Sequence, residues 1–155
     1  MLTKIMGIFD FLKPRNNSKP SRKHISFSNL ALEVIGNPLE ENGFEFYRKK
    51  VETYFTTIIW TKEKQYVKLS ASDFPTDYPY TFDIILGEGN CDDFFESEWD
   101  SISISDIQKL SEPNKKYNGY DFPKKSKFRE SLEKAKTDLS EFGNGFLNGN
   151  LELFY

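Results

Sequence analysis

Four consecutive runs of strand-forming residues constrain the fold of this chain more than any other feature. They lie at residues 44–51, 54–61, 66–72 and 80–86, and each is rich in aromatic and β-branched side chains. Short polar breaks separate the first three runs, which is typical of antiparallel hairpins. In the second run both alternating sets of side chains include large apolar groups, so we expect this strand to be central in the sheet.

Two amphipathic helices are predicted on either side of these strands in the sequence. In residues 28–42 apolar side chains recur at helical spacing, with Ser28 as the predicted N-cap. Because of Pro38, we expect a kink or a break near Gly36 and Asn37. Residues 126–142 have one apolar face, formed by Phe128, Leu132, Ala135, Leu139 and Phe142. A further short helix is predicted at residues 105–110. The predicted fold is therefore α+β, with a four-stranded, mainly antiparallel sheet packed by two amphipathic helices on one face.

The N-terminal part of the chain differs in charge from the rest. Residues 1–25 hold six Lys or Arg and one Asp, and residues 1–13 have the spacing of a short amphipathic helix. We favour a docked or frayed helix here, and a peptide that contacts a membrane surface or a partner is the alternative that the sequence leaves open. Residues 15–24 are polar and basic, so we interpret them as a flexible tether in which His24 is solvated. The predicted division is residues 1–25, helix and tether, and residues 26–155, a single α+β domain.

Cysteine content and hydrophobicity bear on the compartment in which the protein works. The lone cysteine, Cys91, has no partner for an internal disulfide bond. No apolar run approaches the roughly 18 residues that cross a bilayer, and the N-terminus lacks the pattern of a secretory signal. We therefore expect a cytoplasmic protein.

No motif in the sequence indicates catalysis. Nucleophilic catalysis needs a nucleophile beside a base, and the chain holds one His and one Cys. Carboxylates are abundant enough for acid/base chemistry, but no spacing singles out a pair. Residues 92–100 are acidic without the alternating pattern of an EF-hand loop. We predict a protein that is not an enzyme and that has no metal ion and no cofactor.

An acidic stretch with interleaved aromatic side chains is the first candidate for a binding site. Residues 73–108 hold ten Asp or Glu and no Lys or Arg, which argues against nucleic acid as a partner. Aromatic anchors ringed by acidic groups suit a basic protein partner, such as a toxin domain. Aromatic side chains that simply plug the sheet are the alternative. The predicted partner-binding residues are Asp92, Asp93, Phe95, Glu96, Glu98, Trp99 and Asp100.

The loop at residues 73–79 is the second candidate. Its two prolines restrict the backbone and its aspartates favour turns, so we expect it to be semi-rigid. A pocket between this loop and the sheet would suit an enzyme or a small-ligand-binding domain. The predicted pocket residues are Asp73, Asp77 and Tyr78.

Four short strings of the sequence carry a resemblance. They are residues 68–80, 86–89, 98–101 and 145–150. In these strings the chain resembles small uncharacterised bacterial domains, some of which are similar to immunity proteins of bacterial toxin systems. The strings cover less than half of the chain and include no catalytic signature, so the resemblance implies a fold and a bacterial cytoplasm and transfers no active-site residue. Together with the acidic stretch, it leads to the hypothesis of an immunity protein that neutralises a toxin.

Overall fold

The computed structural model describes residues 19–89, 101–113, 119–122 and 124–150, and these residues form an α+β fold. The strands are β1 (Glu45–Val51), β2 (Phe55–Lys62), β3 (Gln65–Ser72), β4 (Thr81–Glu88), β5 (Ser101–Ser103) and β6 (Tyr120–Asp121). They form one sheet in the order β1-β2-β3-β4-β5, and β6 pairs with β4 beyond the end of β5. Every pair is antiparallel. The predicted α+β class and antiparallel sheet are therefore confirmed.

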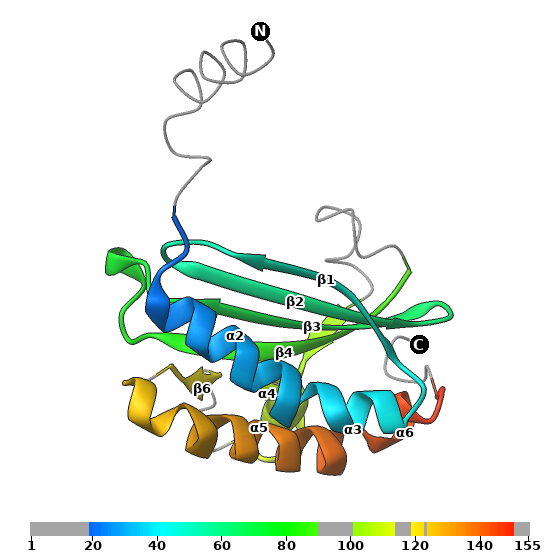
Figure 1. The fold of residues 1–155 in the computed structure, drawn as a ribbon. Coiled ribbons are helices and arrows are strands. Elements are labelled where there is room, and N and C mark those ends of the chain that lie inside the picture. The colour runs from blue at the N-terminus through cyan, green and yellow to red at the C-terminus, as the bar shows by residue number, and fades with distance from the viewer. Residues whose placement is uncertain (1–18, 90–100, 114–118, 123, 151–155) are drawn as a thin grey trace, which may run out of the picture.

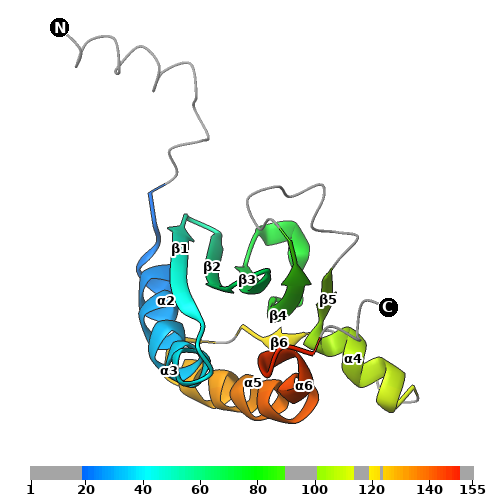
Figure 2. The same ribbon diagram turned by 90° about the vertical axis from the view of Figure 1, so that its right-hand side faces the viewer.

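The main helices cover one face of this sheet (Figure 1). The helices are α2 (Arg22–Val34), α3 (Gly36–Glu41), α4 (Ile104–Ser111), α5 (Phe128–Phe142) and α6 (Asn144–Leu147), with the short 3-10 helices η1 (Pro75–Asp77) and η2 (Lys125–Lys127). α2 and α5 lie side by side under the strands, and α3 and α6 continue this layer. Figure 2 shows α4 on the β5 side of the sheet.

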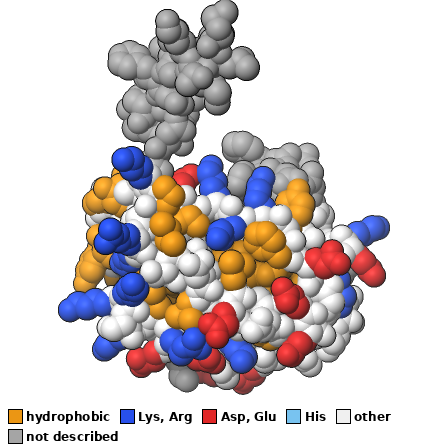
Figure 3. Space-filling model, viewed as in Figure 1, with side chains coloured by type: hydrophobic (Ala, Val, Ile, Leu, Met, Phe, Trp, Pro, Cys, Tyr) orange, Lys and Arg blue, Asp and Glu red, His pale blue; other side chains and the backbone are white. Residues whose placement is uncertain are grey.

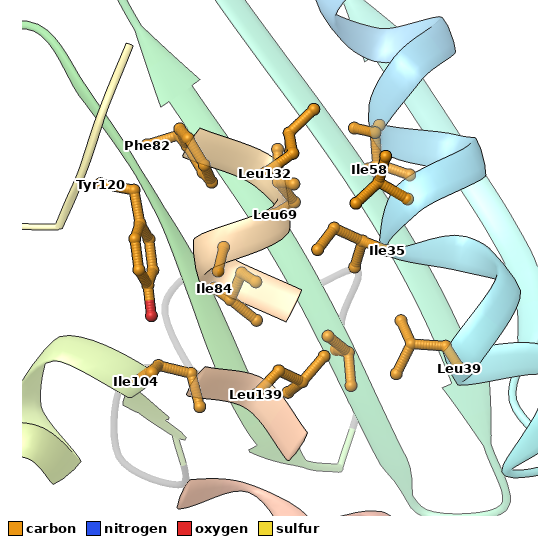
Figure 4. Close-up of a cluster of buried hydrophobic side chains, with 14 of the residues drawn as sticks. Ile35, Leu39, Ile58, Leu69, Phe82, Ile84, Ile104, Tyr120, Leu132 and Leu139 are labelled. Atoms are coloured by element: carbon orange, nitrogen blue, oxygen red, sulfur yellow. The ribbon is translucent and has the colours of Figure 1, made fainter. Parts of the chain in front are cut away.

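The core lies between the sheet and the helix layer, and it is aromatic at its centre. The Phe27 ring of α2 contacts the rings of Phe82, Phe122 and Phe128 at centroid distances of 4.8–5.2 Å. Aliphatic side chains fill the rest of this layer (Figure 4), among them Ile35, Leu39, Ile58, Leu69, Ile84, Ile104, Leu132 and Leu139. The predicted apolar face of α5 is thus the face that packs on the sheet.

The other face of the sheet carries a smaller buried cluster, formed by Ile59 and Tyr66. Tyr66 is paired across the strands with Gly87, and its ring occupies the space over this glycine. A Cβ added to Gly87 would lie 2.0 Å from Tyr66 Cζ, so the ring requires a glycine there. Ile58 and Trp60 are buried on the helix side of β2 while Ile59 is buried on the opposite side. The prediction that this strand is central is confirmed.

β1 is an edge strand of the sheet. Six of its seven residues are exposed, and Val51 at its end is partly buried. The pairing with β2 shifts at a β-bulge between Phe46 and Arg48. Three basic residues follow one another along the strand, Arg48, Lys49 and Lys50.

The predicted number of strands and helices is corrected by the structure. The sheet contains β5 and β6 besides the four predicted strands, and α3 and α6 accompany the two predicted amphipathic helices. The short helix predicted at residues 105–110 is confirmed as α4. β5 and β6 have three and two residues, which is too short for an alternating pattern to be visible in sequence. The predicted break is present but lies at Ile35, between the end of α2 at Val34 and the start of α3 at Gly36, so Pro38 belongs to α3.

The start of α2 also differs from the sequence prediction. The helix begins at Arg22, and Ser21 is its N-cap, with Oγ accepting a hydrogen bond from the His24 N–H at 3.0 Å. Ser28, the predicted cap, is buried inside the helix. The last residues of the predicted tether therefore belong to α2, while the predicted helix at 1–13 lies outside the described residues. None of the described helices has the length and apolar character needed to cross a membrane.

Candidate functional site

The loop between β3 and β4, residues 73–79, is tied to one end of the sheet by short hydrogen bonds. The Asp73 N–H donates to the carbonyl of Tyr54 at 3.0 Å, which joins the loop to the turn between β1 and β2. The Ser72 hydroxyl donates to Asp77 Oδ2 at 2.8 Å across η1. The aromatic side chains carried by this loop therefore have defined positions.

His24 forms a buried polar cluster where α2 meets this loop. Its Nδ1 lies 2.7 Å from Thr56 Oγ1, and its Nε2 lies 2.8 Å from Asp73 Oδ1. His24 and Thr56 have no exposed surface, and the Phe122 ring covers the imidazole at a centroid distance of 4.9 Å. The prediction that His24 is a solvated residue of a tether is therefore wrong. The side chain links α2 to β2 and to the loop.

The cluster contains the three groups of a nucleophilic triad: a carboxylate, an imidazole and a hydroxyl. A carboxylate only accepts hydrogen bonds, so Nε2 of His24 donates to Asp73, and in the neutral ring Nδ1 accepts from the Thr56 hydroxyl. Catalysis would also require that the hydroxyl reach a substrate. Because Thr56 and His24 are fully buried, we assign the cluster a structural role in which buried polar groups satisfy one another.

A surface groove next to this cluster is lined by basic and aromatic side chains. Lys23 Nζ lies 3.3 Å from Asp73 Oδ2 and 4.4 Å from the centroid of the Phe122 ring. The Tyr78 side chain, 76% exposed, stands perpendicular to Tyr80 at a centroid distance of 5.4 Å. The groove has a volume of about 450 Å³. We name it the lysine groove, and its lining residues are Lys23, Tyr78, Pro79, Tyr80, Asp121, Phe122 and Lys124.

The same end of the sheet carries an exposed aromatic cluster, which we name the aromatic patch and which consists of Tyr54, Phe55 and Phe74. The Phe74 ring stacks on Phe55 at 6.0 Å and meets Tyr54 edge-on at 5.3 Å. Each of the three side chains is 39% exposed. Single exposed apolar side chains are ordinary on a protein surface, whereas a contiguous exposed group indicates contact with another molecule.

The residues predicted to form a loop pocket are only partly brought together. Tyr78 lines the lysine groove. Asp73 instead binds His24 and Lys23, and Asp77 accepts the hydrogen bond from Ser72. The residues predicted to bind a basic partner lie outside the described residues: Asp92, Asp93, Phe95, Glu96, Glu98, Trp99 and Asp100.

His24 was missed by sequence reasoning although the sequence carries a signal for it. His24, Phe27, Ala31 and Val34 follow one another at steps of three, four and three residues, so His24 lies on the buried face of α2. The polar composition of the preceding run concealed this periodicity. Lys124 had no such signal, because it is far in sequence from the β3–β4 loop and only the tertiary fold brings the two together.

A second polar network lies where α4 packs against β4. Burial raises the pKa of the Asp83 carboxyl above its ordinary value, while a hydrogen bond with Ser105 opposes this shift. Asp138 Oδ2 accepts hydrogen bonds from the Tyr120 hydroxyl at 3.0 Å and from Gln108 Nε2 at 2.8 Å. Burial, together with the negative charge of Asp138, raises the pKa of Tyr120. These groups join α4, α5 and β6 to the sheet, which accounts for them structurally.

The described part of the chain shows no metal centre that would identify the site. Within the described ranges, no group of three or more His, Cys, Asp or Glu side chains is placed to hold a metal ion. Comparison of the chain with protein families, with curated proteins and with solved structures found no match.

Proposed function

We propose that the protein is a non-enzymatic protein-binding domain that contacts its partner through the aromatic patch. The observation that carries this proposal is the contact of the Phe74 ring with both Tyr54 and Phe55 at the surface, where all three rings remain partly exposed. Aromatic side chains supply much of the binding energy at protein interfaces, because each buries a large area with few rotatable bonds. Rings that already pack on one another also lose less conformational entropy on binding.

The specific role that we propose is that of an immunity protein that neutralises a bacterial toxin. The support comes from the resemblance at residues 68–80, 86–89, 98–101 and 145–150, and from the ten acidic residues within 73–108. A protein that blocks a toxin by covering it needs aromatic anchors and complementary charge rather than catalytic groups. In this proposal the aromatic patch supplies the anchors, and the acidic stretch matches a basic surface of the toxin.

A small-ligand-binding domain is the second candidate, and the lysine groove is the observation that favours it. The volume of about 450 Å³ lies within the range of small-molecule sites. Such sites bury most of their ligand, however, and a wall of this groove is the mostly exposed Tyr78 side chain. We therefore rank this candidate below protein binding.

The test is to purify the protein with the product of the gene next to its own, as the candidate toxin, and to measure complex formation by isothermal titration calorimetry. Phe74→Ala removes the ring that contacts both other members of the aromatic patch. We expect it to weaken binding about 30-fold, which corresponds to about 2 kcal/mol. Leu110→Ala is the matched control, because Leu110 is an exposed apolar residue of α4 outside the patch.

Two results would count against the proposal in different ways. If the parent protein forms no complex with the candidate toxin, the immunity role is wrong. If the parent and Phe74→Ala bind with equal affinity, the aromatic patch is not the binding surface.

A further inference from the structure

The end of the molecule around the lysine groove is rich in positive charge. Basic residues lie at the start of α2 and in or beside η2, and these two elements contact each other. Figure 3 shows Lys and Arg side chains next to hydrophobic ones on this side of the protein, at the left of the view. Asp73, which pairs with Lys23, and Asp121 are acidic residues at the groove. The basic residues are Lys19, Arg22, Lys23, Lys124, Lys125 and Lys127.

The charges at the start of α2 are opposite to those that stabilise a helix. A helix N-terminus carries a partial positive charge, so acidic side chains are favourable there and basic ones are not. The first turn of α2 contains Arg22 and Lys23 and no acidic residue. Local arrangements that disfavour the folded protein are expected where function requires them. Asp73 offsets part of this charge by pairing with Lys23, and an anionic group bound close to the helix start would offset more of it.

The two lysines of the groove differ in how firmly they are held. Lys23 is fixed by Asp73 and lies over two rings, with Nζ 4.4 Å from the Phe122 centroid and 5.8 Å from that of Tyr80. A charge already held in position loses little entropy when a ligand binds. Lys124 is exposed and forms no ion pair with another described residue. The groove therefore offers one ordered cation and one that can adapt to a ligand.

We infer that the lysine groove binds an acidic, extended segment of the protein partner. The inference rests on the proposed protein-binding function and adds a site and a chemistry to it. Carboxylates of the segment pair with Lys23 and Lys124, and an aromatic or proline side chain of the segment lies against Tyr78 and Tyr80. The two rings stand perpendicular to each other at the groove, and aromatic side chains line the grooves of other peptide-binding domains. At this groove the partner is thus acidic, unlike the basic surface expected opposite residues 92–100.

The mixed charge of the groove favours a peptide over nucleic acid. A nucleic-acid site presents continuous positive charge to regularly spaced phosphates. In the lysine groove, Asp121 lines the wall and Asp73 partly neutralises Lys23. A peptide can place a neutral residue opposite Asp121, whereas each phosphate of a nucleic acid carries a negative charge that Asp121 would repel.

The probe for this inference is a short fluorescein-labelled peptide of alternating Glu and Tyr, with binding followed by fluorescence anisotropy at low and physiological salt. Lys124→Glu reverses an exposed charge of the groove, and Tyr78→Ala removes its most exposed ring. We expect each change to weaken binding about tenfold, and added salt to weaken binding to the parent. Lys64→Glu is the matched control, since it makes the same charge change in the turn between β2 and β3, at the other end of the sheet.

Two further probes separate the contributions of charge and ligand class. A peptide with Gln in place of Glu keeps the rings and removes the charge, and a single-stranded oligonucleotide of the same net charge keeps the charge and changes the chemistry. The inference is overturned if the acidic peptide does not bind, if the Gln peptide binds equally well, or if the oligonucleotide binds more tightly. Equal effects of Lys124→Glu and Lys64→Glu would also overturn it, because binding would then follow net charge alone.

The peptide and complex measurements distinguish failure of the groove from failure of the proposed function. A complex that depends on Phe74, combined with no peptide binding, would remove the groove and leave the protein-binding function in place. Peptide binding combined with a complex that is insensitive to Phe74→Ala would support the groove and reject the aromatic patch. Thermal unfolding of every variant confirms that each compared protein is folded.

Discussion

Aromatic rings pack on one another both in the core around Phe27 and in the exposed aromatic patch, and the two regions differ in how they are covered. Around Phe27 the ring centroids are 4.8–5.2 Å apart, and the four side chains have at most 3% exposure. In the aromatic patch the distances are similar, 5.3–6.0 Å, yet the rings remain partly exposed. The helix layer covers the first region, whereas the second lies at the end of the sheet beside the β3–β4 loop. Ring contact alone therefore does not identify a core, and coverage by a second layer decides whether rings stabilise the fold or remain available for binding.

The largest effect is expected from truncating the centre of the covered region. Phe27→Ala removes a fully buried ring that contacts three others, so we expect it to lower the free energy of unfolding by about 3–5 kcal/mol. Urea unfolding followed by circular dichroism measures this loss. A loss below about 1 kcal/mol would contradict the difference between the two regions, because the covered rings would then contribute no more to stability than the exposed ones.

The next effect concerns the connection between the two regions. His24→Ala leaves the buried Thr56 hydroxyl and Asp73 without their shared partner, which we expect to cost about 1–3 kcal/mol. The loop at 73–79 should also loosen, so the Asp73 N–H should exchange its hydrogen faster. Thr56→Val keeps the shape of the side chain and serves as a milder comparison. Unchanged stability and unchanged exchange would show that His24 does not hold the loop.

A smaller, pH-dependent effect is expected at Asp83, where burial works against a charge. The folded-state pKa is raised above the ordinary value of 3.8, so the folded protein loses stability as the pH rises through the folded pKa. Asp83→Asn keeps an acceptor oxygen without the charge. We expect this variant to be more stable than the parent at pH 7 and equal to it below pH 3.8, as measured by thermal unfolding across pH. A constant difference across this range would exclude ionisation of Asp83 as the cause.

The smallest effect on stability is expected in the aromatic patch. Phe74→Ala removes a partly exposed ring, so the free energy of unfolding should fall by less than about 1 kcal/mol. The same urea titration used for Phe27→Ala measures it. A loss as large as that of Phe27→Ala would show that the aromatic patch is a continuation of the core and would remove the physical basis of the binding proposal.

The main strands and α5 could be predicted from sequence because each has a visible period. The two apolar sets of β2 indicated a strand buried on both faces, and Leu132 with Leu139 marked the buried side of α5. β5 and β6 were missed because three and two residues carry no period. The start of α2 was misplaced because Ser21 and Ser28 are both good N-caps, and the burial of His24, which decides between them, is a tertiary property.

The candidate site was less predictable than the fold. The sequence indicated the 73–79 loop and placed Tyr78 beside a pocket, and Tyr78 does line the lysine groove. Asp73 is predicted for the same pocket, but its carboxylate instead pairs with Lys23 and is hydrogen-bonded to His24. The groove combines residues from α2, the β3–β4 loop and the segment before α5. No local sequence pattern indicates that these three segments lie together in the folded protein.

The exposed edge of β1 has a consequence for how copies of the protein behave toward one another. The backbone of an edge strand can pair with the same edge of a second copy and start an aggregate. In β1 the bulge after Phe46 interrupts the regular ladder, and Arg48, Lys49 and Lys50 bring like charges together whenever two such edges approach. Salt screens this repulsion. Concentrated solutions of the protein should therefore stay monodisperse at low ionic strength, and copies should begin to associate through β1 as salt is added.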